Sequence, residues 1–313
     1  MTQARIPLLI DTDPGVDDAL ALLMAFDDPG HEVVGLTITA GNVGLGHTVA
    51  NALKLCEVAG REDVPVFPGC ELPLLHPAPD AADVHGADGF GDAGLAPARR
   101  QAEAEHAAQA IIRLSHAHAG RLLLVALGPL TNLALALKLD PSLPARIGRL
   151  VVMGGAVNGR GNITPFAEFN THFDPEAAHI VFEAFPAFDL ADWEATLAHG
   201  FLHEDVDRWC AADSPTARFY DAISRKTRGW SAERRGDRWH SADALAMAWA
   251  LAPADGSTAT RRLQVALDGP ARGVTLVDWQ GLEPRPANAR ILLQFPQPVF
   301  EARVAAALAR VPG

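Results

Sequence analysis

The stretch DTDPGVDDAL, residues 11–20, places four carboxylates within eight positions, directly after the apolar run Ile6–Ile10. Pro14 and Gly15 indicate a turn, and apolar residues with helical spacing follow over Asp18–Phe26. An apolar strand that ends in a turn and leads into a helix is typical of the first unit of an α/β sheet. Because ligands of such sheets bind beyond the carboxyl ends of the strands, we expect a functional site here.

The four carboxylates, those of Asp11, Asp13, Asp17 and Asp18, are too many for a helix N-terminus alone to neutralise. A helix N-terminus stabilises one or two negative charges by about 0.3–1 kcal/mol each. The crowding therefore requires either protonated carboxyls or a bound cation. Since carboxylate oxygens are hard ligands, the sequence predicts Ca²⁺ or Mg²⁺ rather than a thiophilic metal. Taken singly, one or two of these aspartates can equally be helix caps.

Further along the chain, short apolar runs alternate with helical patterns. The strand-like runs include Val33–Thr39, Leu122–Leu127 and Arg149–Met153. Continuous apolar strands between helices predict an α/β fold with a mostly parallel open sheet and helices on both faces. Towards the C-terminus, Arg262–Leu267 and Val274–Asp278 flank a Gly-Pro turn, which indicates a small antiparallel addition.

The composition limits the class of protein. The 313 residues are 49% hydrophobic and 20% charged, as in globular proteins, and no linker divides them, so we expect one domain over residues 1–313. The net charge of −12 argues against general binding to nucleic acid or to anionic membranes. Three cysteines without a CxxC pair suggest neither a disulfide framework nor a zinc site. With no signal-peptide core and no apolar run of ~20 residues, a cytoplasmic protein is expected.

Two segments interrupt the alternation of strands and helices. Leu72–Arg100 is rich in Pro, Gly, Asp and His, and loops of this length in compact domains are usually functional or disordered. Asp213–His240 begins as an amphipathic helix and continues as the polar stretch RKTRGWSAERRGDRWH, before the apolar helix Ala242–Leu251. Trp230 and Trp239 in this region either face a ligand or pack against the protein.

DTDPGVDDAL resembles the signature of the nucleoside hydrolase family, the inosine–uridine-preferring N-ribohydrolases. Other blocks agree with the family in order and spacing over roughly residues 6–253, namely Gly41-Asn42-Val43, Gly128-Pro129-Leu130-Thr131-Asn132, Met153-Gly154-Gly155, Gly161-Asn162, Ala167-Glu168-Phe169-Asn170 and Asp174-Pro175-Glu176-Ala177-Ala178. The resemblance implies the Rossmann-like nucleoside hydrolase fold. It also implies hydrolysis of ribonucleosides to ribose and free base, in purine and pyrimidine salvage, by a homodimer or homotetramer.

The resemblance also implies a bound Ca²⁺ that holds the ribose 2′- and 3′-hydroxyls and a nucleophilic water. The implied metal ligands are three carboxylates and one backbone carbonyl, those of Asp13, Asp18, Asp243 and Leu127. Asp13 would also be the general base. The implied substrate contacts are Asp17 and Asn170 for the diol, Asn162 and Glu168 for the 5′-hydroxyl, and Asn42 and Met153 for the walls of the ribose pocket. Carboxylates suit this reaction because cleavage gives the sugar oxocarbenium character.

The residue that protonates the leaving base stays open. His85, in VHGADGFGD, resembles the family's loop histidine near the nucleobase. Many members also carry a histidine immediately before the aspartate that matches Asp243, but Ala242 stands there in this sequence, and His240 comes two residues earlier. The predicted catalytic residues are therefore Asp13, His85 and His240, and the preferred base is left open.

Two alternative functions are compatible with parts of the pattern. A protein that binds nucleosides or ribose without cleaving them would keep the same metal and sugar groups. An Asp-x-Asp after the first strand also marks Mg²⁺-dependent phosphatases of the haloacid dehalogenase type. These phosphatases need a later lysine and a paired acidic motif near the C-terminal strands, and none of Lys54, Lys138 and Lys226 is followed by such a motif.

Overall fold

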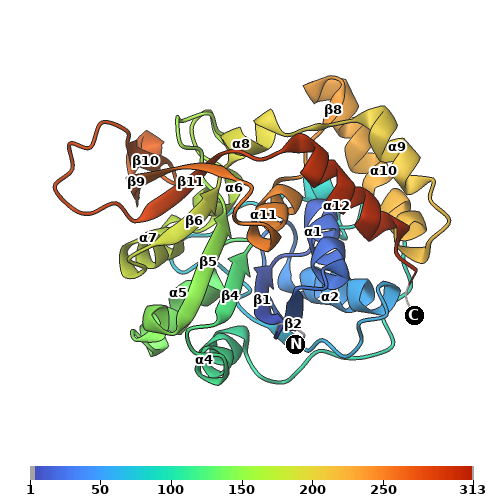
Figure 1. Cartoon of the computed structure of the whole chain (residues 1–313), viewed down its shortest axis with the longest axis horizontal. Coiled ribbons are helices and arrows are strands. Elements are labelled where there is room, and N and C mark those ends of the chain that lie inside the picture. Colours follow the sequence, from blue (N-terminus) through green and yellow to red (C-terminus); the bar gives the residue numbers. More distant parts are fainter. Residues whose placement is uncertain (1–3, 312–313) are drawn as a thin grey trace.

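The computed structural model describes residues 4–311, so residues 1–3 and 312–313 of the predicted domain lie outside the described part. Its main sheet has nine strands in the order β10-β9-β11-β6-β5-β4-β1-β2-β3 (Figure 1). The strands are β1 (Ile6–Thr12), β2 (His31–Ile38), β3 (Val66–Pro68), β4 (Leu122–Ala126), β5 (Ile147–Met153), β6 (Phe188–Ala191), β9 (Ser257–Val265), β10 (Thr275–Asp278) and β11 (Ala289–Gln294).

The sheet is parallel from β3 to β11 and antiparallel only where β9 joins β11 and β10. The predicted fold class, with its antiparallel C-terminal addition, is therefore confirmed. The chain leaves β1 towards β2 and β3, and later returns to place β4 on the other side of β1. In open α/β sheets this reversal of strand order creates a crevice at the carboxyl ends of the two strands, here β1 and β4.

Helices cover both faces of the sheet, as its apolar strands require. Leu8 and Ile10 of β1 pack into one core, and Leu9 between them packs into the other. The helices on the first face, at the right of Figure 1, include α1 (Val16–Asp27), α2 (Leu45–Val58), α10 (Pro215–Arg235), α11 (Ala242–Leu251) and α12 (Gln297–Ala309). Those on the second face are α4 (Ala107–Ala117), α5 (Thr131–Leu139) and α7 (Pro175–Ala184).

The remaining elements are short. They comprise α3 (Ala82–His85), α6 (Phe169–Phe173), α8 (Trp193–Ala198), α9 (His203–Cys210), two 3₁₀ turns at Leu143–Ala145 and Gly269–Ala271, and a separate antiparallel pair of β7 (Phe201–Leu202) and β8 (Arg238–Trp239). Among residues 4–311, no helix combines the length and the hydropathy of a membrane span.

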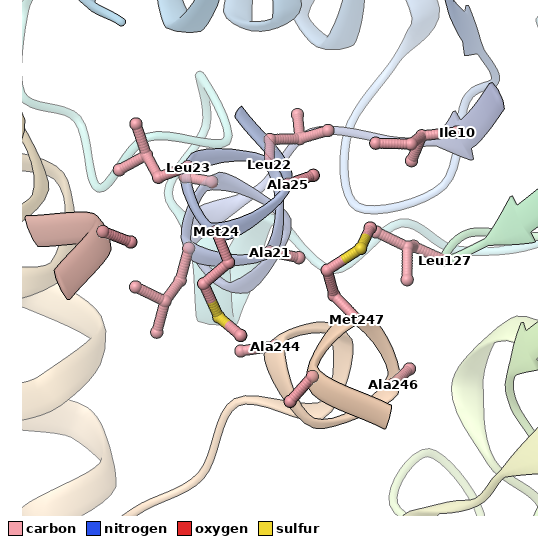
Figure 2. Packing of buried hydrophobic residues seen from close by; sticks show 14 of the residues in the cluster. Ile10, Ala21, Leu22, Leu23, Met24, Ala25, Leu127, Ala244, Ala246 and Met247 are labelled. Atoms are coloured by element: carbon pink, nitrogen blue, oxygen red, sulfur yellow. The ribbon is translucent and has the colours of Figure 1, made fainter. Parts of the chain in front are cut away.

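Helices α1 and α11 pack against each other through small and flexible side chains. Figure 2 shows Met24 of α1 reaching towards Ala244 of α11, and Met247 of α11 reaching towards Leu127 at the end of β4. Alanines such as Ala21 and Ala244 let the two helices approach, and the unbranched methionines fill the space that remains. This packing brings the first turns of α1 and α11 to the same end of the sheet.

The limits of two helices are not evident from the sequence pattern. The sequence indicates a helix only at the start of Asp213–His240, but α10 continues through the polar stretch to Arg235. Arg228 is 8% exposed and pairs with Asp207 and Asp221, so hydrogen-bonded ion pairs stabilise a helix that apolar periodicity does not reveal. Helix α4 begins at Ala107, and the side chain of His106 before it accepts a hydrogen bond from the backbone N–H of Ala108.

Candidate active site

A cavity of about 560 Å³ lies where the carboxyl ends of β1 and β4 meet the first turns of α1 and α11. Every predicted site residue except Asp18 lines it: Asp13, Asp17, Asn42, His85, Leu127, Met153, Asn162, Glu168, Asn170, His240 and Asp243. Asp18 is fully buried beside them. The tertiary structure therefore gathers residues that are spread over more than 200 positions of the sequence.

The acidic centre of the cavity joins the starts of two helices. Carboxylate oxygens of Asp17, Asp18 and Asp243 lie within 4.8 Å of one another, and Asp13 lines the cavity outside this group of three. Burial raises the pKa of Asp18, and the neighbouring charge of Asp17 adds to the effect. Burial likewise raises the pKa of Asp13 and of Asp243 well above the usual value, again with repulsion from neighbouring aspartates.

This donor set fits a hard divalent cation. Asp18 and Asp243 are buried and Asp17 is partly exposed, and the mutual repulsion of the three carboxylates would be relieved by a positive charge between them. The first turns of α1 and α11 both contribute, and a helix N-terminus stabilises the ionised form of such carboxylates. Asp and carbonyl oxygens are the ligands that Ca²⁺ prefers.

The carboxylate of Asp13 has a fixed position. Its Oδ2 accepts a hydrogen bond from the backbone N–H of Asn42 at 2.7 Å. Gly41 and Gly128 leave the room that this carboxylate occupies, because a Cβ on Gly41 would lie 2.1 Å from Oδ2 and one on Gly128 would lie 2.3 Å from Oδ1. Since Oδ2 already accepts a hydrogen bond from Asn42, Oδ1 is the better placed of the two oxygens to take up a proton.

The side chain of Asn42 does more than form the pocket wall that the sequence predicts. Its amide Nδ2 donates to Asp18 Oδ2 at 2.9 Å and to the backbone carbonyl of Asp13 at 3.0 Å. One residue at the end of β2 thus holds two members of the acidic cluster. Gly15 allows this approach, because a Cβ there would lie 2.8 Å from Asn42 Nδ2.

Asp11 supports the site from behind and does not line the cavity. Its Oδ1 accepts hydrogen bonds from Thr37 Oγ1 at 2.7 Å and from Asn132 Nδ2 at 2.9 Å. These contacts connect the ends of β1 and β2 with the start of α5. Burial raises the pKa of Asp11 to about 7, although both hydrogen bonds favour the ionised form.

Another part of the cavity lining, around Glu168 and Asn162, carries groups suited to sugar hydroxyls. Buried Glu168 accepts hydrogen bonds from the backbone N–H groups of Gly155 at 2.8 Å, Asn170 at 2.8 Å and Thr171 at 3.1 Å. Burial nevertheless raises its pKa to about 7. Asn162 Oδ1 accepts from the backbone N–H of Phe169 at 2.8 Å, which brings it to the same wall.

Asn170 connects this part of the lining with the ends of β4 and β5. Its Nδ2 donates to the Leu127 carbonyl at 2.7 Å and to the Met153 carbonyl at 3.3 Å. The Leu127 carbonyl, predicted as a metal ligand, is therefore in direct contact with Asn170, which is predicted to bind the diol.

His85 is held against the first turn of α1. Its Nδ1 accepts a hydrogen bond from the backbone N–H of Val16 at 3.2 Å and lies 3.8 Å from Asp17 Oδ1. An accepting Nδ1 places the ring proton on Nε2. Burial lowers the pKa of His85 to about 4, against the attraction of Asp18, so the ring is neutral near pH 7. It can donate a hydrogen bond there but holds no second proton to transfer.

Comparison with known proteins identifies the family. Residues 8–302 match the model of the inosine-uridine preferring nucleoside hydrolase family. The chain belongs to this family. The predicted family and the prediction of an enzyme that hydrolyses ribonucleosides are thereby confirmed.

Individual relatives of this nucleoside hydrolase agree. The non-specific ribonucleoside hydrolase RihC of Klebsiella pneumoniae is 37% identical over 310 residues, which are 98% of this chain and 100% of the relative. The probable uridine nucleosidase 1 of Oryza sativa subsp. japonica is 41% identical over 234 residues, 74% of this chain and 72% of the relative. A solved plant nucleoside hydrolase superimposes with a TM-score of 0.93 at 30% identity, over 98% of this chain and 99% of that chain.

The nucleoside hydrolase also has a cavity wall that the sequence analysis did not assign. We call this the tryptophan–arginine wall, and it consists of Trp193, Trp230, Arg234 and Arg235. Trp239 and His240 adjoin it, so both tryptophans of the polar segment, Trp230 and Trp239, line the cavity. Burial lowers the pKa of His240, and the charge of Arg235 lowers it further.

A signal for part of this wall is present in the sequence. The cavity-lining residues Thr227, Trp230, Ser231 and Arg234 follow the i, i+3, i+4, i+7 spacing of one helix face. The pattern is hidden because the face is polar and aromatic rather than apolar. Arg235 and Trp193 come together only in the tertiary structure.

Proposed function

We propose that this nucleoside hydrolase cleaves the N-glycosidic bond of ribonucleosides with a Ca²⁺ ion held by Asp13, Asp18, Asp243 and the Leu127 carbonyl. The observation that carries the proposal is the convergence of buried carboxylates from the starts of α1 and α11 on one cavity. A bound divalent cation supplies positive charge that orients hydroxyl groups and makes a nearby water more acidic.

Asp13 acts as the general base. Its Oδ1 takes a proton from the attacking water, while the N–H of Asn42 holds Oδ2 in place. Burial raises the pKa of Asp13, which makes its carboxylate a stronger base. As the bond from C1′ to the base breaks, the surrounding carboxylates stabilise the positive charge that develops on the sugar.

The ribose is oriented from both ends. Asp17 and Asn170 hold the 2′,3′-diol, Asn42 and Met153 form walls, and Asn162 and Glu168 hold the 5′-hydroxyl. Glu168 restricts what can occupy this end, because its buried carboxyl would repel a 5′-phosphate. The substrates are therefore nucleosides rather than nucleotides.

His85 and His240 belong to the nucleobase side, where each donates a hydrogen bond from a neutral ring. The relatives support uridine as an accepted substrate, since two of them are named as a probable uridine nucleosidase and as a non-specific ribonucleoside hydrolase. A salvage role, a cytoplasmic location, a homodimeric or homotetrameric assembly and a single catalytic domain over residues 1–313 stay predictions from the sequence.

A substrate panel tests the proposal. The full chain, supplied with Ca²⁺, is incubated with uridine, inosine, uridine 5′-monophosphate and an aryl phosphate, and the release of ribose, base or phosphate is measured. We expect cleavage of uridine or inosine and of neither phosphate. Binding of uridine without release of ribose would support the non-catalytic alternative, and release of phosphate would support the phosphatase.

A further inference from the structure

Permanent positive charge in the cavity is confined to one place. Among the described residues that line the cavity, Arg234 and Arg235 are the ones whose side chains stay charged at all working pH values. Both lie in the last turn of α10, an element separate from the segments that carry the ribose-binding glutamate and asparagines. The carboxylates, Asn162 and Asn170 are assigned to the metal and the ribose, which leaves the tryptophan–arginine wall for the nucleobase.

The guanidinium of Arg235 is held by two aromatic rings from different elements. It lies 4.7 Å from the ring centroid of Trp193 at the start of α8 and 5.1 Å from that of Trp230 on α10. Stacking on aromatic faces fixes the plane of the guanidinium while its N–H groups stay available at the edge. Arg234 contacts only one of these rings, that of Trp230 at 5.1 Å.

Arg235 also acts on groups at the reacting end of the cavity. Burial raises the pKa of Asp17 to about 6, and the charge of Arg235 opposes that rise. Burial lowers the pKa of His240, and the charge of Arg235 lowers it further. The first residue of α11 is Ala242, which offers no proton donor at the position next to Asp243. The structure therefore combines an absent acid with a cation that is stacked on two aromatic rings and stays accessible to solvent.

Resting on the proposed N-ribohydrolase function, we propose that Arg235 is a catalytic residue that stabilises the leaving nucleobase by hydrogen bonding from its guanidinium. When the C1′–N bond breaks, its electron pair stays on the base, and the oxygen of water bonds to C1′. One proton of that water passes to Asp13, and the base anion, held by Arg235, takes a proton from solvent. Arginine does not give up its own proton, so it acts as a fixed electrostatic partner for charge that develops in the transition state.

The test compares two leaving groups in wild-type protein and in Arg235→Gln. The substrates are uridine, which needs help to release its base, and p-nitrophenyl riboside, whose phenolate leaves unaided. We expect Arg235→Gln to lower kcat for uridine about 10²-fold, the usual effect of removing one transition-state donor, and for the aryl riboside less than about threefold. Arg235→Lys, which keeps the charge but loses the planar fork, should show the same split with a smaller loss for uridine.

Arg225→Gln is the matched control, because Arg225 also lies on α10 but pairs with Asp221 at the surface and is outside the cavity. It should change neither rate. Equal slowing of both substrates by Arg235→Gln and Arg235→Lys would overturn the inference, as would a split produced by Arg234→Gln or His240→Ala but not by Arg235→Gln. If the wild-type protein cleaves neither substrate, the proposed function itself fails, which is a separate result.

Discussion

Gly128→Ala should inactivate the enzyme by displacing the general base. A Cβ at position 128 would lie 2.3 Å from Asp13 Oδ1 and 2.8 Å from its Cγ. Non-bonded carbon and oxygen atoms need at least about 3 Å, so the carboxylate must move by roughly 0.7 Å or more. Misplacement of a reacting group by about 1 Å can reduce the rate about 10²-fold, and we expect a loss of kcat of this size. Overpacking should also destabilise the fold by about 1–3 kcal/mol.

The assay measures ribose release from uridine at saturating substrate, with thermal melting of the same samples. Gly46→Ala is the matched control, because Gly46 lies in the first turn of α2 and a Cβ there meets nothing within 4 Å. Alanine in a helix is about 0.5–1 kcal/mol better than glycine, so the control should be fully active and no less stable. If folded Gly128→Ala keeps kcat within about threefold of wild type, the placement of Asp13 as the base is wrong.

Three further predictions follow from the same geometry. Asp13→Asn should lower kcat by about 10²–10⁴-fold. It should not lower the melting temperature of the chelated protein, because it removes one of several crowded buried charges. A loss of kcat below about tenfold would mean that another group activates the water. 2′-Deoxyuridine should show kcat/KM at least about 10²-fold below uridine, since Asp17 and Asn170 would be left without their partner, and comparable values would contradict that assignment. The pKa values of Asp11 and Glu168 are raised to about 7 in the folded chain, so folding binds protons, and the stability from these groups is present near pH 4 and lost as pH rises through 7. The melting temperature of the chelated protein should therefore fall as the pH rises from 5 to 7.5, and Asp11→Asn should make this fall smaller. A pH profile that Asp11→Asn leaves unchanged would contradict the prediction.

Much of the fold can be predicted from the sequence, because hydrophobic runs and turn residues are local signals. Apolar strands such as Leu122–Ala126 are buried on both faces, so their hydrophobic runs alone indicate a parallel sheet. The acidic cluster is equally visible, since Asp13, Asp17 and Asp18 are near neighbours in the chain and Asp243 was placed by resemblance. The structure brings these residues into one cavity, as the strand order at β1 and β4 requires.

Other features depend on contacts that no local pattern carries. The side-chain amide of Asn42 donates a hydrogen bond to Asp18, 24 positions earlier in the chain. The local sequence around Asn42 indicates a turn and does not reveal this contact. The polar part of α10 is helical because Arg228 is buried with two aspartates, one of which is on α9. The stacking of the Arg235 guanidinium requires Trp193, which is more than 40 residues away in the sequence. These are tertiary relations, and they include the residue that we assign to the leaving group.

The most direct test of the account is a titration of the chelated full chain with Ca²⁺ while ribose release from uridine is followed. We predict no turnover in the chelated protein and full turnover when about one Ca²⁺ per chain has been added, with Asp243→Asn requiring far more. Full turnover by the chelated protein, or none at saturating Ca²⁺, would contradict the claim that the buried carboxylates of α1 and α11 form a calcium-dependent N-ribohydrolase site.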